Sequence, residues 1–211
     1  MNFVGHALAA SWKSREPVFA LGAMLPDFAS MCGMRLDAAE GEPIAAGVEY
    51  HHATDRAFHR LEAFARAVAD IAEQLIARGV PRGPARGAAH VGFELCLDGA
   101  LLGEAGAAGA YQGALAAGAL PGVERALSWS APDGPARWRV LCARLVAHGP
   151  PFEYRDPVRV AERVERVLAR RRLLALSPAA AAIVAREMPA IAARVDGAAP
   201  IVLERLRADL A

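Results

Sequence analysis

Apolar positions recur along this chain at the three- and four-residue spacing of helices, and no stretch shows the alternating, β-branched pattern of strands. Ala, Leu, Arg and Glu, which favour helices, dominate throughout. The pattern therefore predicts an all-α fold. The expected helices cover residues 3–11, 18–25, 44–78, 88–104, 107–117, 123–129, 136–148 and 157–172, with two more beginning at Pro178 and Pro200.

Prolines set several of the expected helix ends. The residue before a proline avoids helical backbone angles, so Pro26 is expected to end the second helix and to leave Asp27 just beyond it. Asp156 suits the N-cap of a later helix, and Pro157 suits its first position. No internal repeat or linker interrupts the sequence, so we expect a single helical domain over residues 1–211.

The composition is that of a globular protein. Among the 211 residues, 24 basic and 23 acidic side chains give a net charge of +1, which does not indicate a nucleic-acid partner. The cysteines Cys32, Cys96 and Cys142 lie far apart, which predicts neither disulfides nor a thiolate zinc site and favours a reducing compartment. Residues 105–123 are uncharged but rich in Ala and Gly, so we expect a cytoplasmic protein without membrane insertion.

Histidines and carboxylates form two stripes along the sequence. The first comprises His51, Asp55 and His59, and the second comprises His90, Glu94 and Asp98. Steps of four residues place side chains on one face of a helix, so the members of each stripe can converge. Apolar residues flank the second stripe, so it is expected to face the interior.

Such stripes predict a metal centre, because buried imidazoles and carboxylates cost free energy unless they are paired or bind a cation. We expect His6, in the first helix, and Asp27 to contribute as well. Nitrogen and oxygen ligands without a thiolate suit Zn, Mn or Fe, whereas carboxylates and water alone would favour Mg or Ca. For either stripe taken alone, the alternative is a surface ion pair or a hydrogen-bonded core histidine.

Five segments extend the pattern over most of the chain. They are MNFVGHALAA (1–10), LGAMLPDFASM (21–31), GVEYHHATD (47–55), AHVGFE (89–94) and YRDPVRVAERVERVLARRRL (154–173). In this order they resemble motifs of the acyl carrier protein phosphodiesterases, which are metal-dependent hydrolases related to the HD-domain phosphohydrolases. The resemblance aligns His6, Asp27, His51, Asp55 and His90 with the family's His and Asp positions.

This resemblance implies an HD-like helical bundle that hydrolyses a phosphodiester. The implied substrate is the 4'-phosphopantetheine arm of an acyl or peptidyl carrier protein. One or two divalent ions (Mn, Fe or Zn) are expected, and His59 or His52 is expected to donate a proton or contact phosphate. The expected ligand pool is His6, Asp27, His51, Asp55, His90 and Glu94.

Three positions depart from the family pattern and keep alternatives open. Ala89 stands where the family has Asp, His52 where it has Arg, and His59 where it has an acidic residue. The spacings of the two stripes also resemble the zinc-dependent phospholipase C and single-strand nuclease group, which is the first alternative. The second is a helical binding module without catalytic activity, because the Asp is missing at Ala89.

A late helix carries arginines along one side. They are Arg155, Arg159, Arg163, Arg166 and Arg170, spaced by three or four residues. With Arg171 and Arg172 they outnumber the three acidic residues of this stretch, which predicts a docking face for an acidic carrier protein. The alternative is a solvated helix face on which Glu162 and Glu165 pair with the arginines.

Overall fold

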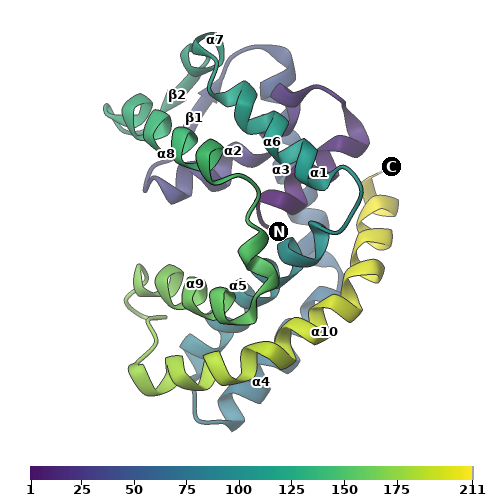
Figure 1. Ribbon diagram of the computed structural model, residues 1–211, viewed down its shortest axis with the longest axis vertical. Coiled ribbons are helices and arrows are strands. Elements are labelled where there is room, and N and C mark those ends of the chain that lie inside the picture. Colours follow the sequence, from purple (N-terminus) through teal and green to yellow (C-terminus); the bar gives the residue numbers. More distant parts are fainter. Residues whose placement is uncertain (211) are drawn as a thin grey trace. The chain divides into compact units, whose positions relative to one another are not determined.

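The computed structural model describes residues 1–210, which are helical nearly throughout (Figure 1). Within these residues the helices are interrupted by two short strands, β1 (Leu36–Ala39) and β2 (Leu127–Trp129), which pair antiparallel. The predicted all-α class is confirmed. The sequence predicted neither strand, because each is too short to show alternation and is stabilised by pairing with a distant segment.

The chain forms two compact units. The first consists mainly of Met1–Arg56 and Leu101–Pro151. Besides the strands it contains α1 (Phe3–Lys13), α2 (Pro17–Met31), most of α3 (Glu42–Arg60), α6 (Ala107–Gly118), α7 (Pro121–Arg125) and α8 (Gly134–His148). The core of this unit includes α1 and α2, in which every residue from Phe3 to Ala10 and from Phe19 to Leu25 is buried.

The second unit consists mainly of Ala57–Ala100 and Phe152–Asp209, and it begins with the last turn of α3. Its other elements are α4 (Glu62–Ala77), α5 (Arg82–Leu101), the 3-10 helix η1 (Phe152–Arg155), α9 (Pro157–Ala169) and α10 (Pro178–Leu210). Asp156 caps α9 as expected, because its side chain accepts a hydrogen bond from the Val158 N–H. The expected single domain over residues 1–211 stays a prediction.

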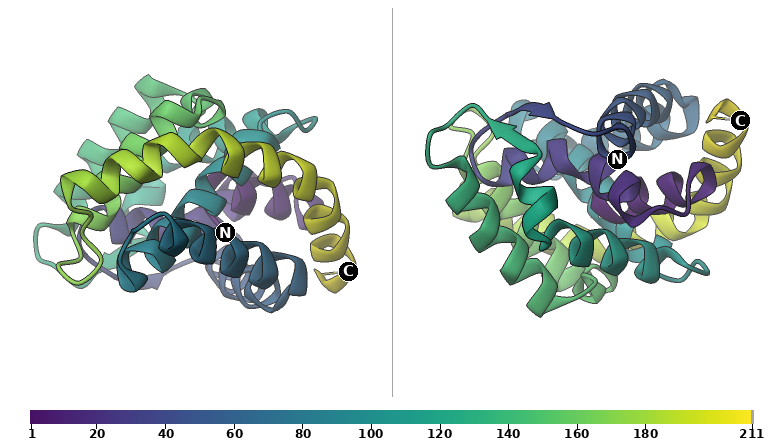
Figure 2. Two further views of the ribbon diagram at one scale, coloured as in Figure 1. Left: turned by 90° about the horizontal axis from the view of Figure 1, so that it is seen from below. Right: turned by 90° about the horizontal axis from the view of Figure 1, so that it is seen from above.

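Several expected helix ends are wrong. Pro26 lies inside α2, which continues to Met31 and therefore contains Asp27. Pro200 likewise lies inside α10, which follows one long curved path (Figure 2). A proline removes one backbone hydrogen bond and kinks a helix, but buried side chains on both sides of each proline keep the helix continuous.

Other helix ends differ from the expected positions for reasons that the local composition does not show. The helix expected over residues 44–78 is divided at Leu61, which has extended backbone angles and a buried side chain. The rings of Phe58 and Phe64 pack together across this division, 4.3 Å apart. Helix α5 begins at Arg82, six residues earlier than expected, because glycine and proline are tolerated in a first turn whose N–H groups have no helical partner.

No helix within residues 1–210 combines the length and the apolar composition that a bilayer-spanning segment requires. The three cysteines are free thiols, as expected from their spacing.

Candidate metal centre

Three helices of the first unit bring two histidines and a carboxylate together. His6 comes from α1, Asp27 from α2 and His51 from α3, and one potential ligand atom of each lies within 4.8 Å of the others. His6 and His51 are buried, while the Asp27 side chain is 29% exposed. The two imidazoles and the Asp27 Oδ2 atom are thus buried, while the rest of the Asp27 side chain is partly exposed.

The tautomer of His6 is fixed by Thr54. Its Nδ1 atom lies 3.0 Å from the Thr54 hydroxyl oxygen, and that hydroxyl donates its own hydrogen to the backbone, 2.8 Å from the His51 carbonyl oxygen. With its one hydrogen directed to that carbonyl, the hydroxyl oxygen accepts from His6, and Nδ1 then carries the proton. Nε2 of His6 then keeps a free lone pair, as a metal ligand requires.

His51 is oriented in the same way by a main-chain group. Its Nδ1 atom lies 2.9 Å from the carbonyl oxygen of Ala23, which can only accept. With its Nδ1 hydrogen directed to this oxygen, His51 is held with Nε2 unprotonated.

Both imidazoles are neutral near pH 7. Burial lowers the pKa of His6 well below its ordinary value and lowers the pKa of His51 to about 4. Their rings stack 4.1 Å apart, which two charged imidazolium rings would oppose. Neutral imidazole is the form of histidine that binds metal ions.

One buried atom makes this group suitable for a cation. Nε2 of His6 is completely buried and makes no hydrogen bond to any described residue. Its neighbours are carboxylate oxygens of Asp27 at 3.8 Å and Asp55 at 3.9 Å, beyond hydrogen-bond distance. Tetrahedral ligands with bonds of 2.1 Å lie about 3.4 Å apart, so a small contraction around a divalent ion would satisfy Nε2.

Asp55 lies at the edge of this group. Its Oδ1 atom is 3.2 Å from the amino group of Met1, and its side chain is 39% exposed. Imidazole nitrogens with carboxylate oxygens and no thiolate would suit Zn, Mn or Fe, and the identity of the metal stays a prediction.

Two glycines let α2 and α3 approach closely enough to form the group. A Cβ atom on Gly22 would lie 2.3 Å from the Ile44 carbonyl oxygen, and one on Gly47 would lie 2.2 Å from that of Phe19. Neither position has room for a side chain without backbone movement. This contact lies one to two turns from Asp27 and His51 on the same helices, so it controls how near those two residues can come.

Gly47→Ala is therefore expected to lower the free energy of unfolding by on the order of 3 kcal/mol, because the added methyl group forces α2 and α3 apart. Denaturant unfolding measures the change. Gly109→Ala is the matched control: it also lies in a helix, and its new Cβ would meet nothing within 4 Å. That variant is expected to be up to about 1 kcal/mol more stable than the wild type. Equal stabilities of the two variants would contradict the close approach.

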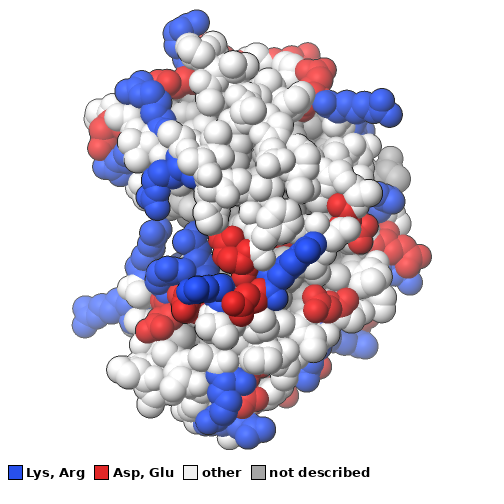
Figure 3. Space-filling model, viewed as in Figure 1, with Lys and Arg blue, Asp and Glu red and all other residues white. Residues whose placement is uncertain are grey.

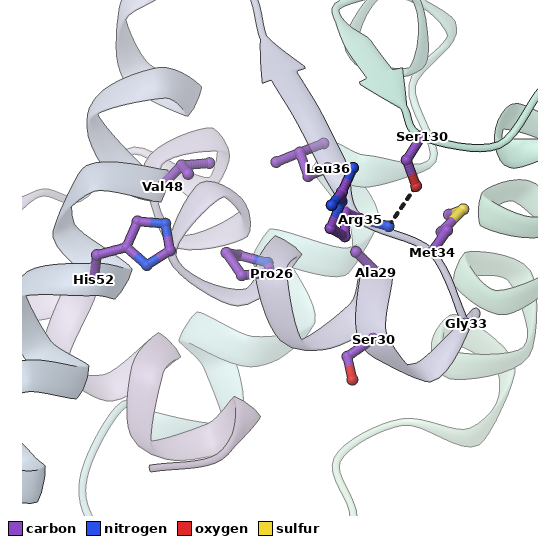
Figure 4. A pocket seen from close by; sticks show the side chains of 10 residues that line it. All are labelled: Pro26, Ala29, Ser30, Gly33, Met34, Arg35, Leu36, Val48, His52 and Ser130. Carbon is purple, nitrogen blue, oxygen red and sulfur yellow. Dashed lines mark hydrogen bonds between the residues drawn. The ribbon is translucent and has the colours of Figure 1, made fainter.

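A cavity of about 600 Å³ opens beside the group in the same unit (Figure 4). His52 and Pro26, the sequence neighbours of His51 and Asp27, line it, and the rings of His51 and His52 are 5.2 Å apart. Figure 4 shows His52 on one side and Arg35 on the other. The remaining wall is mainly apolar and includes Ala29, Met34, Leu36 and Val48.

The expected ligand pool is divided between two groups. His6, Asp27 and His51 lie together in the first unit, whereas His90 and Glu94 lie in the second unit together with His59. His51 and His59 are two turns apart on α3, about 12 Å along the axis, and the expected ligand pool stays a prediction. Asp98, the last member of the second stripe, is fully buried and belongs to neither group.

Sequence reasoning missed two residues of the site. Thr54 faces His6 from α3, and its position three residues after His51 was the available signal. Arg35 lies between two of the expected helices, and its backbone N–H donates to the Ser130 hydroxyl, 2.9 Å away beside β2, which holds Arg35 at the cavity. No local sequence pattern predicts this contact between residues 95 positions apart.

No family model, no curated protein and no solved structure matches this chain. Functional inference therefore depends on the geometry of the site and on the motifs in the sequence.

Proposed function

We propose that this protein is a metal-dependent phosphodiester hydrolase whose metal centre comprises His6, Asp27 and His51. The observation that carries the proposal is the buried Nε2 of His6, which has no hydrogen bond and faces carboxylate oxygens. Thr54 and the Ala23 carbonyl fix both imidazoles with Nε2 available. Such supporting hydrogen bonds are typical of histidines that bind metals.

A divalent cation bound here would supply a Lewis acid that activates water and neutralises charge on phosphoryl oxygens. The chain's own residues would do the rest. Asp55, 3.9 Å from His6 Nε2, can accept a proton or join the ligands. Exposed His52 can donate a proton to the leaving oxygen from the adjoining cavity.

The cavity supports a substrate with an organic arm next to its phosphate. Its volume of about 600 Å³ lies within the usual range for small-molecule sites, and its apolar wall suits an uncharged arm. Arg35 is the cationic residue among those that line it, so it would contact a phosphoryl oxygen. The proposed ligand is thus a phosphodiester with one largely uncharged substituent.

An acidic carrier protein is the proposed macromolecular partner, following the resemblance of the sequence motifs. Supporting this, α9 exposes Arg159 and Arg166, and its C-cap residue Arg170 is exposed as well. Acidic side chains lie among these arginines, since Arg159 forms an ion pair with Glu162 at 3.1 Å. Figure 3 shows acidic side chains (red) interspersed with basic ones (blue). The face is therefore positive overall but partly neutralised.

The experiment that tests this function is hydrolysis of bis-p-nitrophenyl phosphate by protein loaded with Mn or Zn, compared with Arg35→Ala. We expect the variant to raise KM about tenfold or more with little change in kcat, because a charge-assisted hydrogen bond contributes about 1.5–3 kcal/mol. Arg35→Lys should recover part of the loss.

Chelation provides the decisive control. Removing divalent ions should abolish hydrolysis, and adding Mn or Zn back should restore it. Hydrolysis that persists in chelator, or that is absent from metal-loaded protein with both the small substrate and a phosphopantetheinylated carrier protein, would refute the proposed function.

A further inference from the structure

A second group of potential ligands lies within the second unit. His59, from the last turn of α3, meets His90 and Glu94 of α5, and one ligand atom of each lies within 4.8 Å of the others. The Nε2 atoms of both histidines face the same oxygen of Glu94, His90 at 3.3 Å and His59 at 3.9 Å. Three potential metal-ligand atoms, from α3 and α5, thus converge on one point.

Packing holds the two imidazoles in this position. Their rings stack 5.2 Å apart with an interplanar angle of 15°, and the ring of Phe64 stands edge-on to both. Phe93 and Phe58 in turn pack against Phe64. The packed phenylalanine rings therefore hold both histidines with their Nε2 atoms towards the Glu94 carboxylate.

A simple ion pair explains this arrangement less well than a cation does. An ion pair at helical spacing needs only His90 and Glu94, and it gives no reason for a second imidazole stacked beside the first. If both rings carried a proton, their charges would repel at this distance. If both are neutral and carry their proton on Nδ1, two Nε2 lone pairs and a carboxylate face one point, which a divalent ion would stabilise.

We propose that His59, His90 and Glu94 bind a divalent transition-metal ion, with Zn as the best fit, in addition to the ion proposed at His6, Asp27 and His51. Two nitrogens and one oxygen leave a fourth position open, as in zinc sites with two histidines and a glutamate. The histidine side chains are 36% and 41% exposed, so solvent can reach that position. The chain then offers two sets of ligands for divalent ions.

The test is a calorimetric titration of metal-free protein with Zn. Wild type is expected to bind two equivalents, and His59→Ala and His90→Ala are expected to bind one each. Both residues are partly exposed, so their substitution should leave the fold intact, which circular dichroism checks. His148→Ala, an exposed histidine outside both groups, is the matched control and should still bind two.

The combination with His51→Ala separates this site from the proposed hydrolytic centre. His51→Ala alone should lose the other equivalent, and His51→Ala with His90→Ala should lose both. If His59→Ala or His90→Ala binds as much Zn as wild type, the second site is refuted whatever His51→Ala does. If both variants lose one equivalent while His51→Ala loses none, the second site stands and the proposed hydrolytic centre fails.

Discussion

Replacing His51 with alanine is expected to lower the hydrolysis of bis-p-nitrophenyl phosphate by more than about a hundredfold. Loss of a residue that only supports a metal ligand typically costs 10- to 100-fold in affinity or activity, and loss of a ligand should cost more. His51 provides one of the two buried imidazoles, and the Ala23 carbonyl leaves its Nε2 unprotonated. Initial rates at saturating Mn or Zn measure the effect.

Thr54→Val tests the hydrogen bond that supports His6 separately from the ligands, because valine nearly keeps the shape of threonine. The change removes the acceptor of the His6 Nδ1–H while leaving every proposed ligand in place. We expect metal affinity to fall about 10- to 100-fold, with activity recovered by added metal. A Thr54→Val protein with unchanged affinity, or a His51→Ala protein that keeps wild-type activity, would show that this group does not hold the catalytic ion.

Acidification is expected to destabilise the metal-free protein through His51. Its pKa is about 4 in the folded state against 6.5 for an ordinary histidine, because the ring is buried. Above pH 6.5 neither state binds a proton there. Between pH 6.5 and about 4 the unfolded chain binds one and the folded chain does not, so the free energy of unfolding decreases as the pH falls. The full effect is roughly 3 kcal/mol.

Urea unfolding in chelator at pH 7, 6, 5 and 4 measures this dependence, with His51→Gln as the reference. Glutamine can still donate to the Ala23 carbonyl but does not titrate, so carboxylates elsewhere affect both proteins alike. The free energy of unfolding of the wild type minus that of the variant should decrease by roughly 3 kcal/mol from pH 7 to pH 4. A difference that stays constant from pH 7 to pH 4 would mean that His51 is not buried as a neutral imidazole.

The sequence predicted the helical class and which histidines and carboxylates share a helix face, because both depend on local spacing. His51 and Asp55 share a helix face by periodicity alone, and so do His90 and Glu94. Periodicity does not tell which helices meet. The division of the predicted ligands into two groups therefore became visible only in the structure, where His59 joins the second group.

Helix ends, and the residues that hold the candidate site in place, were harder to predict from the sequence. The preference against helix before a proline is overridden at Pro26, where buried residues on both sides keep α2 continuous. Leu61 ends a helix although nothing in its own chemistry demands an end there. Likewise, Thr54 and Arg35 matter through contacts with residues 48 and 95 positions away, and no local window contains such information.

The most direct test of the central claim is an anomalous difference map from crystals of this protein grown with Mn or Zn. We expect a peak bonded to Nε2 of both His6 and His51, at about 2.0–2.3 Å, with Asp27 completing the protein ligands. A map without a peak at these three residues, from crystals kept in millimolar metal, would contradict it.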